Sequence, residues 1–97
     1  MSDAVEKGGR RDDSASVWDT SLRDLVDYLA RGLVDEPEQV EVEEIEESDA
    51  LVFELKVAES DLGKVIGKQG RTAKALRTIL SAASAKSGRR VILEILE

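Results

Sequence analysis

The stretch LGKVIGKQGRTAKALRTIL, from Leu62 to Leu80, decides how the rest of the chain is arranged. At its centre lie Gly67, Lys68, Gln69 and Gly70, with helix-forming sequence on both sides. Gly67 can take a left-handed backbone conformation that ends the first helix, and Gly70 stands where the second helix begins. A helix start exposes unpaired N–H groups and the positive end of the helix dipole. The stretch therefore predicts two helices joined by a tight turn that suits a phosphate group.

Two glycines at this spacing are weak evidence alone, because a chain of this length contains about half of one such pair by chance. The neighbouring basic residues strengthen the signal. On a helical wheel with Arg71 at 0°, Lys74 falls near 300° and Arg77 near 240°, while the apolar residues fall between about 80° and 200°. This arrangement predicts a basic edge beside the core-facing stripe. With Val65 and Ile66 as an apolar floor, it suits a single nucleic-acid strand.

Charge is distributed unevenly along the chain. Residues 1–60 hold 18 acidic and 6 basic side chains, a net charge of −12, whereas residues 61–97 hold 3 acidic and 8 basic side chains, a net charge of +5. The total of −7 hides this difference. Because screening limits the reach of a charge to about 10 Å, the local sign governs the binding of a polyanion. The second part of the chain is therefore a candidate region for binding a polyanion, although an acidic tail with ordinary solvated faces would give the same asymmetry.

Composition also argues against several functional classes. The chain contains no Cys and no His, so it lacks the usual zinc ligands and the commonest general base. The acidic residues between Glu41 and Asp49 lack the spacing of a calcium-binding loop and are typical of a solvated sheet face. We expect no enzymatic activity, no metal and no cofactor. Without a long apolar run or an apolar leader, we expect no membrane partner and a cytoplasmic location.

The segments before the quoted stretch predict one helix and two strands. Residues 21–34 have the apolar period of an amphipathic helix, with Ser21 as its cap. Residues 40–43 alternate as a strand does, but the phase slips at Glu44, which predicts a bulge or the end of the strand. Residues 51–57 alternate more regularly and predict an antiparallel partner strand.

After the turn, the second long helix is expected from Arg71 to about residue 86. Residues 90–97 are apolar on both faces apart from Glu94, which predicts an interior or well-covered strand. The order of elements predicts an α+β fold, with helices packed on one face of a three-stranded sheet. Residues 1–18 are polar and predict a disordered tail, leaving residues 19–97 as a single domain. Trp18 is expected to pack on the first helix.

The segment VIGKQGRTAKALRTIL resembles the signature of KH domains, and the order of elements resembles their type II topology. The segment LVDYLARGLVDEPEQVEVEE is similar to the small bacterial KhpA (YlqC-like) RNA-binding proteins. The resemblance implies a mixed sheet with one parallel pair of strands. It also implies single-stranded RNA binding, in a role such as RNA chaperone or post-transcriptional regulator linked to growth and division. Dimerisation is implied too, with a second copy or with a KhpB/Jag-like KH protein.

Two hypotheses about function remain open at this point. In the first, the chain grips short single-stranded RNA, and Val57 adds an apolar contact for bases. The residues expected to bind RNA are Lys64, Val65, Ile66, Gly67, Lys68, Gln69, Gly70, Arg71 and Lys74. In the second, the chain is a protein-interaction module that dimerises through its alanine-rich second long helix and its last strand.

Overall fold

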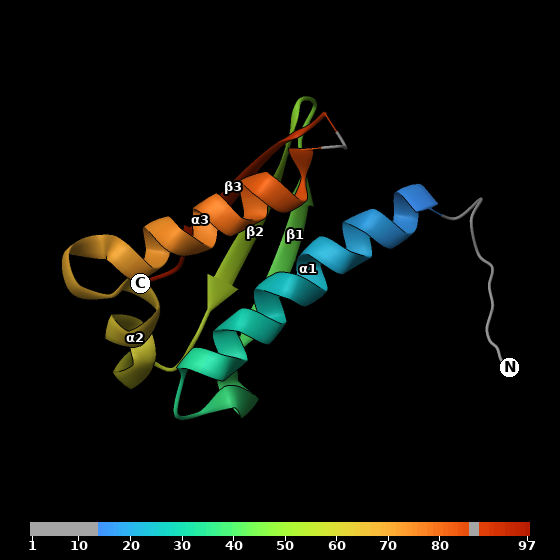
Figure 1. Cartoon of the computed structure of the whole chain (residues 1–97). Coiled ribbons are helices and arrows are strands. Elements are labelled where there is room, and N and C mark those ends of the chain that lie inside the picture. Colours follow the sequence, from blue (N-terminus) through green and yellow to red (C-terminus); the bar gives the residue numbers. More distant parts are fainter. Residues whose placement is uncertain (1–13, 86–87) are drawn as a thin grey trace, which may run out of the picture.

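The computed structural model describes the backbone of residues 14–85 and 88–97, and the side chains from Leu22 onward (Figure 1). In chain order the elements are helix α1 (Ser14–Leu33), the 3₁₀ turn η2 (Pro37–Gln39), strands β1 (Glu41–Glu46) and β2 (Ala50–Lys56), the 3₁₀ turn η3 (Glu59–Asp61), helix α2 (Leu62–Ile66), the 3₁₀ turn η4 (Lys68–Gly70), helix α3 (Arg71–Ala83) and strand β3 (Arg90–Ile95). This order confirms the predicted α-β-β-α-α-β arrangement.

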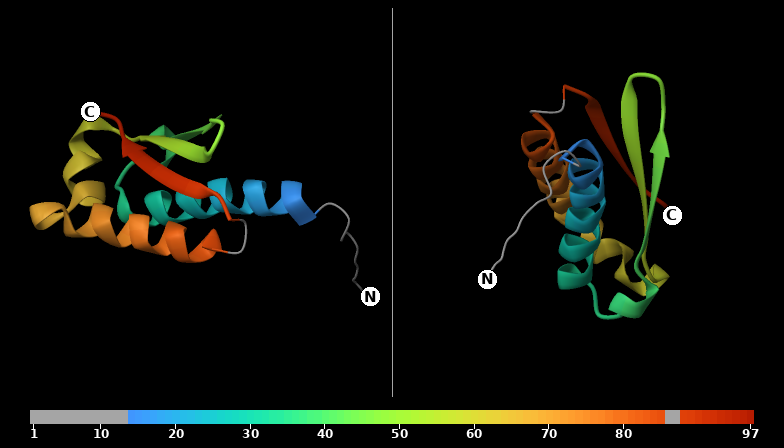
Figure 2. Two further views of the ribbon diagram at one scale, coloured as in Figure 1. Left: turned by 90° about the horizontal axis from the view of Figure 1, so that it is seen from above. Right: turned by 90° about the vertical axis from the view of Figure 1, so that its right-hand side faces the viewer.

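The three strands form one mixed sheet in the order β1-β2-β3. Strands β1 and β2 pair antiparallel, with Glu41 opposite Lys56. Strands β2 and β3 pair parallel, with Ala50 opposite Arg90. Figure 2 shows α1 and α3 on one face of this sheet, while no helix of the described residues lies on its other face. The predicted two-layer α+β fold is therefore confirmed.

The core lies between the sheet and the helices. Strand β2 is central, and its Leu51, Phe53 and Leu55 are fully buried because their side chains face the helix layer. Val26 of α1 and Leu80 of α3 pack in the same cluster. Burying such side chains stabilises a small domain by about 1.5–3 kcal/mol each. The core therefore fixes the position of α3 relative to the sheet.

Helix α1 is longer than the sequence predicted. It begins at Ser14, so Ser21 lies inside the helix and does not cap it. The sequence permits this length, because residues 14–31 contain no glycine or proline to interrupt a helix. Of the disordered tail predicted over residues 1–18, residues 14–18 lie in α1, whereas residues 1–13 and the predicted packing of the Trp18 side chain lie outside the described residues.

The ends of two other elements also differ from the predictions. Helix α3 ends at Ala83, because Ser84 leaves the helical conformation and its hydroxyl donates to the carbonyl oxygen of Ser81. Strand β1 continues to Glu46 with an unbroken register, so there is no bulge at Glu44. The apolar pattern changes phase because Val42 faces the helices, whereas Ile45 faces the opposite side of the sheet, where it lies opposite Val52.

Strand β3 is an edge strand and not an interior one, since among the described residues it pairs with β2 alone. Its helix-facing side chains join the core, and on the other face Ile92 lies opposite Val52. Apart from Arg90 and Glu94, the strand is apolar on both sides because its residues lie opposite apolar residues of β2. Within the described residues, no helix is long and apolar enough to cross a membrane.

An arginine occupies one outward carbonyl group at each edge of the sheet. Arg23 of α1 donates from Nε to the carbonyl oxygen of Val42 in β1 at 3.2 Å. Arg77 of α3 donates from Nε to the carbonyl oxygen of Leu93 in β3 at 3.3 Å. By the alternation of ladder hydrogen bonds, both carbonyl groups point away from β2. Unpaired edge groups are a template for strand addition, so each arginine protects an edge.

Candidate nucleic-acid interface

The turn between α2 and α3 has an unusual backbone. Gly67, Gln69 and Gly70 have φ values of 79°, 59° and 74°, all in the left-handed region. The N–H of Gly67 donates to the carbonyl oxygen of Gly63 at 2.8 Å, and the N–H of Gly70 donates to that of Gly67 at 3.1 Å. The turn is therefore compact and internally hydrogen-bonded. Of its four residues, Lys68 alone has an ordinary negative φ.

Gly67 is required by close packing as well as by its φ. A β-carbon at this position would lie 2.7 Å from the Cβ and 2.8 Å from the backbone nitrogen of Thr72. Real β-carbons do not approach other atoms so closely, and the backbone of α3 cannot move away without shifting the helix. Gly67 thus lets the turn fold back against the first turn of α3.

Helix α3 begins directly after the turn. Its N-cap residue is Gly70, in the left-handed conformation, and no side chain caps this start. The first N–H groups of a helix have no intrahelical acceptor, and the helix dipole adds partial positive charge there. Because Gly70 has no side chain, an anionic ligand could approach the main chain closely. The start of α3 therefore has the chemistry that favours a phosphate group.

Three basic side chains surround this helix start. Lys68 and Lys74 are exposed, and within the described part of the chain no carboxylate lies within ion-pair distance of either. Arg71 is also exposed and donates from Nη2 to the Oε1 atom of Gln69 at 3.0 Å. That acceptor is neutral, so the charge of Arg71 is oriented but not compensated. The predicted RNA-binding residues of the turn and of α3 are thus brought together.

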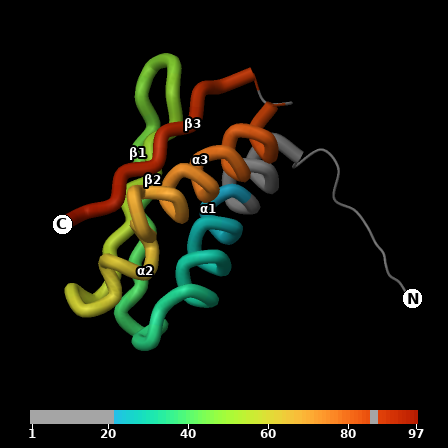
Figure 3. Tube along the Cα trace, turned by 60° about the vertical axis from the view of Figure 1, so that its left-hand side comes forward, coloured from blue at the N-terminus to red at the C-terminus, as the bar shows by residue number. Residues whose placement is uncertain are grey.

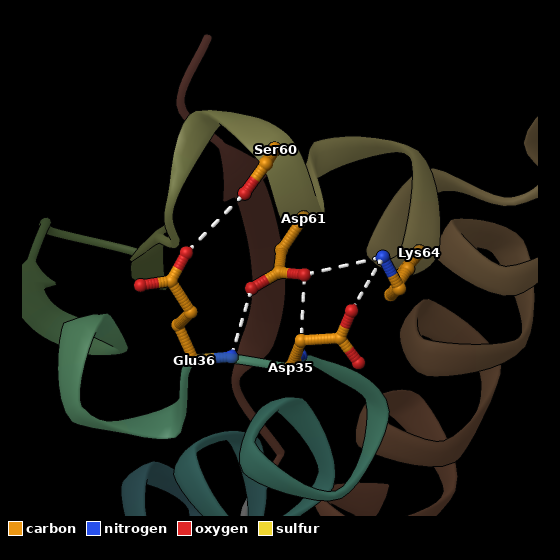
Figure 4. A network of polar contacts seen from close by, with 5 residues as sticks. All are labelled: Asp35, Glu36, Ser60, Asp61 and Lys64. Carbon is orange, nitrogen blue, oxygen red and sulfur yellow. Dashed lines mark hydrogen bonds and ion pairs between the residues drawn. The ribbon is translucent and has the colours of Figure 1, made fainter.

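Lys64 differs from these cations, although the sequence analysis grouped it with them. Its Nζ lies 3.2 Å from a carboxylate oxygen of Asp35 and 3.3 Å from one of Asp61 (Figure 4). Hydrogen bonds to Asp35 and then to Asp61 raise the pKa of Lys64 above its ordinary value. The charge of Lys64 is therefore already compensated within the protein.

Asp61 is the residue that sequence reasoning missed. Its side chain is fully buried, and its two oxygens accept the backbone N–H groups of Asp35 and Glu36, both at 3.1 Å. Burial alone would raise its pKa, but these donors and Lys64 outweigh burial, and the pKa lies below its ordinary value. An aspartate directly before a helix is a common N-cap, yet Asp61 makes no side-chain cap bond to α2. It instead ties the end of α1 to the start of α2.

This tie fixes the base of the interface. Figure 3 shows the end of α1 and helix α2 at the same end of the molecule. Asp61 immediately precedes α2, and α2 leads into the turn at Gly67. The sequence held one signal for this role, an aspartate just before a helix start, but its partners Asp35 and Glu36 lie about 25 residues away and could not be identified from spacing.

The expected apolar floor is only partly at the surface. Val65 is fully buried in the core, and Val57 is buried as well. Ile66 is half-buried and packs against the core cluster. Val65 therefore anchors α2 in the core. Of Val57, Val65 and Ile66, only Ile66 is partly exposed beside the turn.

The fold and this turn define a KH domain of type II, with the glycine-bracketed turn between two helices and one parallel strand pair. Comparison with known families agrees, since the family model described as KhpA/KhpB, KH domain, matches residues 23–95. The chain therefore belongs to this family.

Several curated relatives cover nearly the whole KH domain. The chain is 55% identical over 78 residues to a protein of Aquifex aeolicus named RNA-binding protein KhpA, covering 80% of this chain and 99% of that one. Proteins of the same name in Caldanaerobacter subterraneus and Clostridium perfringens are 53% and 48% identical over 75 residues, covering 77% of this chain and 100% of each relative.

A solved structure is also similar. It is the crystal structure of a variant of Aquifex aeolicus Era bound to GDP and AlF4−, with a TM-score of 0.55 and 25% sequence identity. The similarity covers 77% of this chain but only 29% of the Era chain. It therefore concerns one part of Era.

Proposed function

We propose that this protein binds short single-stranded RNA at the α2–α3 turn and along the basic edge of α3. The observation that carries the proposal is the turn itself, in which Gly67 packs on Thr72 and leaves the uncapped start of α3 beside Lys68 and Lys74. The names of the relatives support the same ligand class. Phosphates would meet the helix start and the lysines, while bases would lie towards Ile66.

This mode of binding implies weak sequence selectivity. Such a turn spans about four nucleotides. Residues 62–83, which form α2, the turn and α3, contain no Phe, Tyr or Trp, so aromatic stacking by the turn itself is not expected to contribute. Phosphate contacts would dominate the affinity. A short, weakly selective grip is compatible with an RNA chaperone or a post-transcriptional regulator acting in the cytoplasm.

The dependence of affinity on salt tests the proposal. We expect the logarithm of the affinity for a labelled single-stranded RNA to fall with the logarithm of salt concentration, with a slope of roughly −2 to −3 for three or four neutralised phosphates. Fluorescence anisotropy at several salt concentrations measures this slope. A flat response would contradict phosphate binding.

The double variant Lys68→Asp, Gln69→Asp locates the site. Asp tolerates the left-handed conformation of position 69 better than most residues, so the turn should keep its backbone. A matched control, Lys56→Asp with Gln39→Asp, changes the total charge equally at two exposed positions outside the turn. RNA binding should vanish in the first variant and persist in the control. Equal losses in both would mean that total charge, and not this site, governs binding.

Self-association is a second candidate function, favoured by one observation. Ile79 of α3 remains 42% exposed, and Ala75 and Ala82 on the same helix are exposed beside it. An apolar strip on an outer helix face favours docking of a second copy or of a KhpB/Jag-like KH protein. Sedimentation of the wild type and of Ile79→Lys tests this. A monomeric wild type, or an unchanged dimer in the variant, would exclude this face from self-association.

A further inference from the structure

The sheet face that carries no helix is organised in rows that run across all three strands. The register places Ile45 of β1, Val52 of β2 and Ile92 of β3 in one row. The adjoining row consists of Glu43, Glu54 and Glu94. The face therefore places an apolar row, in which Ile45 and Ile92 are partly exposed and Val52 is buried between them, directly beside a row of three carboxylates.

The row of glutamates is unfavourable for the isolated protein. Directly opposed side chains on neighbouring strands have β-carbons about 4.5–5.5 Å apart, and like charges in this position are destabilising. Within the described residues, no basic side chain lies within ion-pair distance of any of the three. A local rule of sheet stability is thus broken on every strand of the sheet, and such violations are expected at functional sites.

The same face is also hollowed. A depression of about 310 Å³ is lined by Glu41, Val42, Glu43, Glu54, Lys56 and Leu96. Leu96 is 42% exposed there, in the row beyond the glutamates. The carboxylate row is therefore flanked on one side by the row of Ile92, and on the other by Glu41, Lys56 and the exposed Leu96.

We propose that this face docks a basic amphipathic segment of another protein. A short helix lying across the strands would place its apolar stripe on the row of Ile45, Val52 and Ile92, and lysines or arginines at the edge of that stripe would meet the glutamates. The charge of the face excludes RNA. It also excludes a second copy docking through the same face, because two glutamate rows would repel each other.

The edges of the sheet direct a partner to this face. Arg23 and Arg77 occupy the outward carbonyl groups of Val42 and Leu93, so addition of a strand at either edge would have to displace a hydrogen bond. The α2–α3 turn lies outside this face, so RNA and the partner segment can bind at the same time.

A synthetic peptide probe tests the proposal. The peptide is an amphipathic helix of about 14 residues, with a leucine stripe and lysines along one edge of it, and its counterpart carries glutamates in place of the lysines. We expect the lysine peptide to bind and the glutamate peptide not to bind. Amide chemical shifts should move in β1, β2 and β3 on the open face and not in α1 or α3; shifts confined to the helices would overturn the proposal.

Two variants with matched charge separate docking from general attraction. Glu43→Gln, Glu54→Gln, Glu94→Gln removes the carboxylate row, whereas Asp24→Asn, Glu38→Gln, Asp49→Asn removes as many exposed acids elsewhere. The first should weaken peptide binding by at least about tenfold, since each pair of exposed charges contributes modestly. The second should change it less than about twofold. Equal losses would overturn the proposal.

Thermal unfolding supplies an independent readout. Removing the three opposed charges should raise the Tm of the glutamine variant while peptide binding is lost, because repulsion is relieved. A lower Tm would show that the row stabilises the fold by itself and would overturn the argument. Self-association of the wild type that the glutamine variant abolishes would also overturn it, in favour of a second copy as the occupant.

Discussion

Gly67 and Thr72 approach so closely that a β-carbon on Gly67 would lie 2.7 Å from the Cβ of Thr72. Gly70, three residues after Gly67, has no atom within 4 Å of the corresponding position, although its φ is 74°. The two glycines of the turn are therefore required for different reasons. At position 67, both close packing and the positive φ disfavour a side chain. At position 70, only the positive φ does.

Substitutions at the two glycines should differ accordingly. Gly67→Ala should lower the Tm and abolish RNA binding, because the turn must move away from α3. Gly70→Asn should lower the Tm only slightly, since Asn takes the left-handed conformation more readily than other residues with a side chain. Thermal unfolding and RNA anisotropy measure both effects. Equal loss of stability in Gly67→Ala and Gly70→Asn would contradict the packing argument.

Lys64 should behave differently from Lys68 and Lys74. Lys68→Gln and Lys74→Gln should each reduce the salt slope of RNA binding by about 0.7, the share of one phosphate contact with a single strand. Lys64→Gln should lower the Tm but leave the slope unchanged, because its charge is compensated by Asp35 and Asp61. The measurement is anisotropy over a range of salt. A reduced slope in Lys64→Gln would assign that residue to the RNA contacts instead.

The buried carboxylate predicts how stability depends on pH. Because the pKa of Asp61 in the folded state is lowered from 3.8, it contributes stability that is present above that value and is lost as pH falls through the lower, folded value. Lys64 has a raised pKa, so its contribution is present below 10.5 and is lost as pH rises through the higher, folded value. Both contributions are complete near neutral pH.

Asp61→Asn tests this linkage. An asparagine offers one oxygen where two N–H groups need acceptors, so we expect the Tm at pH 7 to fall by roughly 5–10 °C. Below about pH 4, the wild type should approach the variant in stability. Chemical unfolding from pH 2 to 7 measures the difference. A constant difference over this range would mean that the charge of Asp61 is not linked to folding.

Replacing Arg23, at the β1 edge, should destabilise the fold more than replacing Arg31 on the same helix. Arg23→Met removes the donor to Val42 and should cost about 1 kcal/mol, with increased self-association through the opened edge. Arg31→Met serves as the control, because Arg31 pairs only with Asp27 in an exposed i,i+4 contact worth a few tenths of a kcal/mol. Chemical unfolding and light scattering compare the two. Similar behaviour would contradict edge protection.

Much of the site could be predicted from sequence because it is local. Gly67, Lys68, Gln69, Gly70, Arg71 and Lys74 are close neighbours in the chain, and helix geometry alone places the last two on one edge of α3. The tie between Asp61 and residues 35 and 36 could not be predicted, since it joins separate segments. The same holds for Lys64, whose partner Asp35 lies 29 positions earlier.

The sequence by itself determined the order of the elements, the glycine-bracketed turn and the sign of charge around it, because these depend on periodicity and on neighbours in the chain. Only the tertiary structure decided that β2 is the central strand, that Lys64 is compensated, and that three glutamates meet in one row. Strand pairing sets the first and third of these relations, and the packing of the end of α1 against the start of α2 sets the second. Both bring together residues whose separation in sequence carries no signal of their contact. The phase slip at Glu44 illustrates the difference, because it suggested a bulge until the register placed Ile45 opposite Val52.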